Sequence, residues 1–140
     1  MNFDVNYLAI LVSAIVFMII GFLWYGPFFS KPWMRLVGMS PDAMKTGENR
    51  MRARPLIIVF ICALITSFVL AVLLKSLLIT TANIGTAVEL AIIVWLGFVA
   101  TTMLYRVLFE RSSLKLWLIN ASQSLVAFII GTLILVMWPW

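Results

Sequence analysis

The chain has 140 residues, of which 64% are hydrophobic and only 11% are charged. A water-soluble domain is close to half apolar and a quarter charged, so a globule of this size could not bury all of these apolar residues. Lipid must therefore surround most of the surface, and we expect an integral membrane protein whose first partner is the bilayer.

The formal net charge is +5, which could indicate a nucleic-acid partner. The charges, however, lie in the connections between apolar runs, and this pattern favours a membrane surface and no nucleic acid. Histidine is absent, and the single cysteine, Cys62, lies within an apolar run. We therefore expect no disulfide within the chain, no metal site, no cofactor and no enzymatic activity.

Four apolar runs are long enough to be membrane helices. The first, residues 7–25, carries no charge, and at about 1.5 Å per residue it reaches roughly 28 Å, enough to cross a hydrocarbon core. It is too long for the apolar region of a signal peptide and lacks a small-residue cleavage site. The other spans are expected at about residues 55–75, 88–108 and 115–138. The predicted fold is all-α, a single domain over residues 1–140 that forms an integral membrane four-helix bundle.

The first connection, residues 26–54, is the one extended polar segment. Gly26-Pro27 is expected to end the first helix, because proline lacks a backbone donor and disfavours helical geometry in the residue before it. Trp33, Leu36 and Val37 share one helical face, which predicts a short helix in the cytoplasmic headgroup layer. Ser40-Pro41 has the residues of a helix start, so a second short turn is expected there.

Basic side chains dominate this connection and set the orientation. Arg35, Arg50, Arg52 and Arg54 are expected to contact anionic lipid headgroups, each contributing about 1 kcal/mol near the surface. Nine of the ten basic residues lie in or beside the first and third connections, and only Lys75 lies on the other side. The positive-inside rule then places both connections in the cytoplasm and both termini outside it.

Several sequence blocks also resemble a known family. They are Asn6-Tyr7-Leu8-Ala9, Gly21 followed by Trp24-Tyr25-Gly26-Pro27 and Trp33, Trp95-Leu96-Gly97-Phe98, and Phe109-Glu110-Arg111-Ser112 followed by Asn120. In this order, and over almost the whole chain, they resemble the bacterial family called domain of unknown function 1761. The resemblance implies a small four-helical protein of the bacterial inner membrane, and it implies no activity.

Glu89 is the ionisable residue of most interest, because it lies at the outer end of a membrane helix, where acids are functional candidates. Thr86 and Glu89 also have the spacing of a capping box, and this structural role is the favoured interpretation. A third interpretation is that Glu89 is a free acid on the surface. Asn6 should lie at the same depth. It could line the same outer vestibule, cap the first helix in place of Asp4, or bond a neighbouring helix.

Asn120, Gln123 and Ser124 form a polar cluster within the fourth membrane helix. Asn120, Ser124, Ala127 and Gly131 fall on one face, so this face should turn inward, while Gln123 could serve a neighbouring subunit. Buried amides in lipid must find hydrogen-bond partners, which favours a structural role for the cluster. Lining of a polar path is the alternative.

Aromatic residues mark the expected membrane interfaces. Trp24, Tyr25 and Trp33, beside Pro27, are interpreted as one interfacial belt, and Trp117, Trp138 and Trp140 as further belt residues. Arg106 is interpreted as an anchor that reaches the surface and pairs with Glu110 one helical turn away.

Small residues predict close helix contacts and an assembly of more than one chain. Ala63, Ser67 and Ala71 repeat every four residues in the second span, and Gly97 and Thr101 do so in the third. We expect a homo-oligomer, with a dimer favoured. The favoured function is a non-enzymatic protein that binds lipid, scaffolds or assists a complex. The alternative is an oligomeric transporter or channel for a small solute or ion, with Glu89 and the Asn120 face lining the path.

Overall fold

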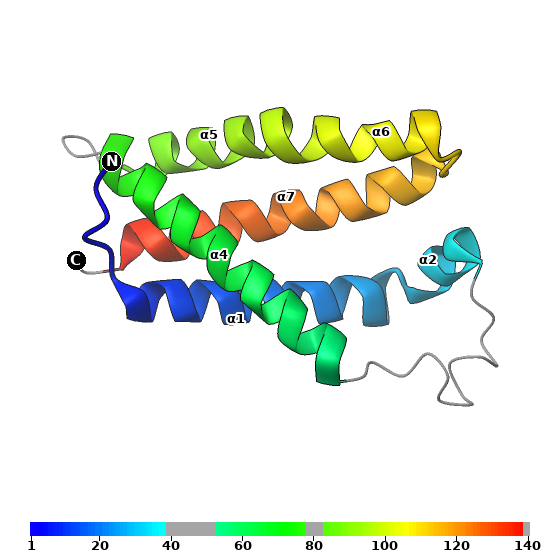
Figure 1. Cartoon of the computed structure of the whole chain (residues 1–140), viewed down its shortest axis with the longest axis horizontal. Coiled ribbons are helices and arrows are strands. Elements are labelled where there is room, and N and C mark those ends of the chain that lie inside the picture. The colour runs from blue at the N-terminus through cyan, green and yellow to red at the C-terminus, as the bar shows by residue number, and fades with distance from the viewer. Residues whose placement is uncertain (39–52, 78–82, 139–140) are drawn as a thin grey trace.

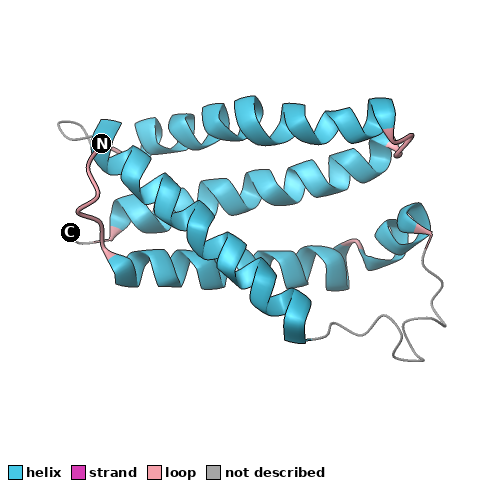
Figure 2. Cartoon of the chain, in the orientation of Figure 1, coloured by secondary structure: helices cyan, strands magenta, loops and turns pink. Residues whose placement is uncertain are grey.

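The computed structural model describes residues 1–38, 53–77 and 83–138, and this part of the chain is helical apart from short connections, with no strand (Figures 1 and 2). The predicted turn at Ser40-Pro41 and the side chains of Arg50 and Arg52 lie outside the described residues. The elements in chain order are α1 (Tyr7–Leu23), η1 (Trp24–Phe28), α2 (Ser30–Val37), α4 (Ala53–Leu77), α5 (Ile84–Val94), η2 (Trp95–Ala100), α6 (Thr101–Phe109) and α7 (Leu114–Met137).

Four helical stretches are long and apolar enough to cross a membrane. They are Tyr7–Phe28, Arg54–Leu77, Ile84–Phe109 and Leu114–Met137. Many large apolar side chains on them face outward, among them Ile93 and Phe98 on the third stretch. Water would penalise such surfaces, whereas lipid tails would not. The chain is therefore a membrane protein by the length, composition and outer surface of its helices.

Asn83 is the N-cap of α5. Its side-chain oxygen accepts the backbone N–H of Thr86 at 2.8 Å, and the Thr86 hydroxyl donates to the Asn83 carbonyl oxygen at 3.0 Å. The capping box expected between Thr86 and Glu89 is therefore wrong. The helix begins one turn earlier than that box requires, so Thr86 occupies the first turn and Glu89 the second. Asn6 does cap α1, where its oxygen accepts the N–H groups of Leu8 and Ala9 at 3.0 and 3.1 Å.

Gly26-Pro27 widens the first helix where an end was expected. Proline has no N–H for the carbonyl of Leu23, and its ring crowds that carbonyl in an α-helix. The chain instead forms the π-helical turn η1, in which the Phe29 N–H donates to the Trp24 carbonyl oxygen at 2.9 Å. Backbone bonding thus continues through the proline. The membrane stretch extends to Phe28 as a result.

The tight core lies at the end of the molecule that holds both termini. There α1 packs against α4 and α7, and α5 packs against α7. The buried cluster includes Ala9 and Ile10 of α1, Leu70 and Ala71 of α4, Ala87 of α5 and Leu135 of α7. In Figure 1 α1 begins and α7 ends at this end, and α4 crosses α1 diagonally.

Small residues set the spacing of α1 from its two neighbours. Ala63, Ser67 and Ala71 of the predicted small-residue stripe are all buried, and the Ser67 hydroxyl donates to the Ser13 hydroxyl at 3.2 Å. A Cβ atom at Gly131 would lie 2.9 Å from the Ser13 oxygen, so α7 can approach α1 this closely only with glycine there. Gly97 and Thr101, by contrast, are exposed on the outside of the third stretch.

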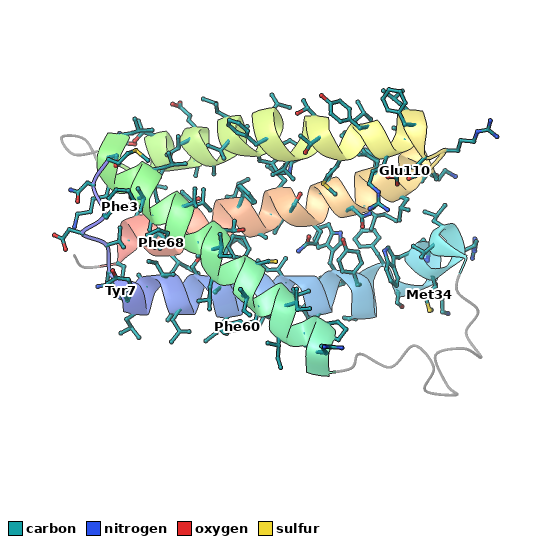
Figure 3. All side chains as sticks on the ribbon, in the orientation of Figure 1. Phe3, Tyr7, Met34, Phe60, Phe68 and Glu110 are labelled. Carbon is teal, nitrogen blue, oxygen red and sulfur yellow. The ribbon has the colours of Figure 1, made fainter. Side chains whose placement is uncertain are left out.

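The N-terminal residues tie down the end of α4. The Asn2 N–H donates to the Ser76 hydroxyl at 2.8 Å, and the carboxylate of Asp4 lies 3.5 Å from the Lys75 ammonium. Phe3 stacks on Phe68 with ring centroids 6.5 Å apart. Both residues lie in the half of the molecule opposite Glu110 (Figure 3). The N-terminal segment is therefore joined to the last turns of α4.

Candidate functional site

The opposite end of the molecule carries the polar residues of α7. The Tyr25 hydroxyl of η1 donates to the Asn120 side-chain oxygen at 2.7 Å. This bond joins two segments 95 positions apart in the sequence. The sequence predicted that the Asn120 amide must have a hydrogen-bond partner, and Tyr25 at the end of the first span is that partner. The bond also fixes the rotation of α7 against α1.

Three indole N–H groups bond helix backbone around the same level of α7. Trp24 donates to the Ile119 carbonyl at 3.0 Å, and Trp117 donates to the Ala100 carbonyl at 3.1 Å. Trp95 donates both to the Ala121 carbonyl at 3.1 Å and to the Ser124 hydroxyl at 2.9 Å. Trp24 and Trp95 each open a π-helical turn, so both π turns are bonded to α7 next to Asn120.

A polar cleft of about 590 Å³ opens between η1, α2, α6 and α7. Its lining combines hydrogen-bonding, charged and aromatic side chains with a few apolar ones. The lining residues are Tyr25, Trp33, Leu36, Val37, Met103, Arg106, Glu110, Ser112, Leu116, Asn120, Gln123 and Ser124. Trp33 and Tyr25 meet at one wall, with ring centroids 5.3 Å apart. The cleft is large enough for a polar headgroup or a small organic molecule.

The connection from α6 to α7 supplies the charged wall of the cleft. Arg106 Nε donates to Glu110 Oε2 at 2.9 Å, which confirms the predicted pair. Both Glu110 and Ser112 donate their backbone N–H groups to the Arg106 carbonyl, at 3.1 and 3.2 Å. Arg111 closes this turn with φ at 54°, the left-handed conformation that glycine usually provides at a helix end.

The Arg106–Glu110 pair contributes little to stability. Its two side chains are 64% and 61% exposed, and an exposed pair of this spacing is worth only about 0.3–0.5 kcal/mol. Its structural effect is to hold the guanidinium at the mouth of the cleft.

A second, apolar cleft of about 200 Å³ lies between α1, α4 and α7. Phe17 and Met18, the α4 residues Val59, Cys62, Ala63 and Thr66, and the α7 residues Ala127 and Phe128 form most of its lining. Gln123 and Ser124 line this cleft as well as the polar one. A polar and an apolar space therefore adjoin at one place on α7.

The family model described as a protein of unknown function, DUF1761, matches residues 8–136. The chain belongs to this family. Comparisons with curated proteins and with solved structures gave no match. The polar and apolar clefts of this DUF1761 protein lie within the matched range.

Of the residues singled out from the sequence, the polar cleft unites Tyr25, Trp33, Asn120, Gln123 and Ser124. Glu89 is exposed on α5, and neither it nor Asn6 lines the two clefts. Glu89 and Asn120 lie in opposite halves of the molecule, since α5 and α7 begin at opposite ends (Figure 1). The path that the transport alternative requires between these two residues stays a prediction.

The remaining candidate residues lie around this end of the molecule. Arg35 on α2 and Arg54 at the start of α4 are exposed, as headgroup contacts require, and their contact with lipid stays a prediction. Pro27 lies inside η1. The Trp24 indole and the Tyr25 hydroxyl bond α7, so these two members of the predicted belt also have partners within the protein.

Sequence reasoning left Trp95, Ser112 and the cleft itself out of the site. The position of Trp95 along its membrane span could have identified it. It lies near the middle of the third apolar stretch, where an indole N–H finds no water and must bond protein. The same reasoning places Tyr25 and Asn120 at a similar depth in the membrane. Tyr25 lies near the end of the first span, and Asn120 lies about two turns after the start of the last span. No comparable signal marks Ser112.

Proposed function

We propose that this DUF1761 protein is a non-enzymatic membrane protein that binds one amphipathic molecule from the bilayer. The polar head occupies the cleft beside Tyr25 and Asn120, and the apolar part occupies the cleft between α1, α4 and α7. One observation carries this proposal: two clefts of opposite chemistry share Gln123 and Ser124 as lining residues. A soluble metabolite would have no use for the apolar cleft, and a purely apolar ligand would leave the polar one unfilled.

The polar contents of the cleft also favour binding over catalysis. The Tyr25 hydroxyl is bonded to the Asn120 oxygen, and Ser124 bonds Trp95. Glu110 is held by Arg106. General acid–base chemistry needs a group that is free to exchange a proton near the reacting atom, and these partnerships suit recognition instead.

The proposal also covers the membrane, the orientation and the oligomeric state of the protein. It lies in a bacterial inner membrane with the polar cleft and the basic connections toward the cytoplasm and both termini outside. It forms a dimer through the exposed small residues Gly97 and Thr101, at which a neighbouring helix could approach closely.

A pair of tryptophan substitutions on α4 tests the binding function. Thr66 lines the apolar cleft, whereas its neighbour Ile65 is 58% exposed on the outer surface. The Thr66→Trp indole fills the cleft, so this variant should lose the lipid that the wild type retains through purification in mild detergent. Ile65→Trp adds the same indole outside the cleft and should retain the lipid.

Native mass spectrometry of the full chain reads out the retained lipid directly. A wild type that retains no lipid and rebinds none contradicts the proposal, as does equal retention in the two variants. The same spectra give the number of chains in each particle, and a monomer under every condition contradicts the dimer.

A further inference from the structure

Only part of the Arg106 guanidinium, at the polar cleft, is hydrogen-bonded within the protein. Its Nε donates to Glu110 at 2.9 Å, and its two terminal nitrogens make no hydrogen bond or ion pair with any described residue. Nε is the inner nitrogen of the group, so a bond there leaves the outer edge, with its paired N–H donors, open for a second acceptor. Such an edge matches the two oxygens of a phosphate or carboxylate.

The side-chain NH₂ group of Asn120 is also available to donate hydrogen bonds. The Tyr25 hydroxyl occupies the Asn120 side-chain oxygen, and the Asn120 NH₂ group makes no hydrogen bond with the described residues. The NH₂ group of an amide carries two N–H donors, which can bond acceptor atoms of a ligand. The Asn120 amide and the guanidinium both line this cleft, which therefore presents donors from two different helices.

The charges around the cleft favour the same ligand chemistry. The described cations at this end are Lys31, Arg35, Arg54, Arg106, Arg111 and Lys115, against the single described carboxylate of Glu110. An excess of positive charge around a cleft with apolar walls raises the local concentration of anions.

We infer that the bound molecule carries an oxyanion, a phosphate or a carboxylate, and that Arg106 is the residue that binds it. Glu110 is a positioning residue that holds the guanidinium toward the cleft. This inference rests on the proposed function, because it names the head of the same amphipathic molecule. A lipid headgroup and a free phosphate share this chemistry, and the test separates them.

The test compares three probes on the full, delipidated chain in a non-ionic detergent. Phosphatidic acid and diacylglycerol with the same acyl chains differ only in the phosphate, and inorganic phosphate has no acyl chain. The variants are Arg106→Gln, Glu110→Ala and Glu110→Gln. Lys115→Gln is the matched control, since Lys115 is an exposed cation at the same end that does not line the cleft.

We expect phosphatidic acid to bind more tightly than diacylglycerol and Arg106→Gln to weaken it by about tenfold or more, as loss of a charge-assisted fork predicts. Lys115→Gln should bind like the wild type. Glu110→Ala should weaken binding while Glu110→Gln retains it, because glutamine still offers an oxygen to Nε. If Glu110 merely repelled the anion, both Glu110 variants would bind more tightly, and its positioning role would be wrong.

The remaining outcomes separate the two proposals. Equal binding of phosphatidic acid and diacylglycerol, unchanged in Arg106→Gln, overturns the anion site and leaves amphiphile binding intact. Arg106-dependent binding of inorganic phosphate, without binding of either lipid, supports the anion site and overturns the proposed function. Binding of none of the three probes overturns both.

Discussion

The bond between Tyr25 and Asn120 links two residues whose side chains would be expensive to leave unpaired in a membrane. The hydroxyl and the amide oxygen are 2.7 Å apart, and both side chains are half-buried. In lipid neither group can turn to water, so the pair holds η1 against α7 as well as shaping the wall of the cleft. The same two residues therefore line the cleft and join the two helices.

Tyr25→Phe removes the hydroxyl and keeps the ring. We expect it to lower the free energy of unfolding in detergent by about 0.5–1.5 kcal/mol, since it leaves the Asn120 oxygen without a donor. Asn120→Ala should lower it by a similar amount, and the double variant should lose less than the sum of the two. Tyr105→Phe, on an exposed tyrosine of α6, is the control. Strictly additive losses would show that the bond does not couple the two helices.

At the scale of single elements, the α5 cap explains where the third span begins. Asn83→Ala should destabilise the protein by about 0.5–2 kcal/mol, because the Thr86 N–H loses its acceptor at the start of the helix. Asn83→Ser keeps a short oxygen-bearing side chain and should retain most of the stability. Glu89→Gln should change the melting temperature little, since Glu89 is exposed in the second turn. A loss with Glu89→Gln as large as that with Asn83→Ala would restore the acid to a structural role.

Length and hydropathy are sufficient to predict the four apolar spans. Short polar side chains predict a cap at Asp4 or Asn6, and the structure shows that Asn6 is the cap. These features depend on residues close together in the sequence. The buried stripe of Ala63, Ser67 and Ala71 was predictable for the same reason, because a helix repeats its face every turn. The start of α5 was misplaced because two neighbouring residues, Asn83 and Thr86, both have the chemistry of a cap, and only the fold shows which one does it.

The π turns and the cleft could not be predicted in this way. Both π turns begin with a Trp-x-Gly sequence, Trp24-Tyr25-Gly26 and Trp95-Leu96-Gly97, and each indole bonds a carbonyl of α7. In η2 the wide turn is further tied by the Thr101 hydroxyl, which donates to the Gly97 carbonyl at 2.9 Å. Pro27 accounts for the wide turn of η1, whereas η2 contains no proline and its indole is bonded to a helix far along the chain. The cleft, in turn, depends on how the two turns rotate the residues beyond them.

At the scale of the whole molecule, the two ends differ in packing and in charge. The end at which α1 begins is packed around Leu70 and Leu135 and carries the Asp4–Lys75 pair. The other end is open at the polar cleft and carries most of the cations that the structure describes. A protein that takes an amphipathic molecule from one leaflet needs this asymmetry, because a site open at both ends would not retain the ligand in that leaflet.

The asymmetry also determines which way the protein should insert. Of the cations that the structure describes, all but Lys75 lie at or near the open end, so the positive-inside rule predicts that this end faces the cytoplasm. Ile84 and Leu114 begin helices at opposite ends and are nearly equally exposed, at 54% and 56%. In a Cys62→Ala background, a membrane-impermeant maleimide should label Ile84→Cys in right-side-out vesicles and Leu114→Cys only after the vesicles are opened. The reverse pattern would place the cleft on the outer face and direct the search for its ligand to the outer leaflet.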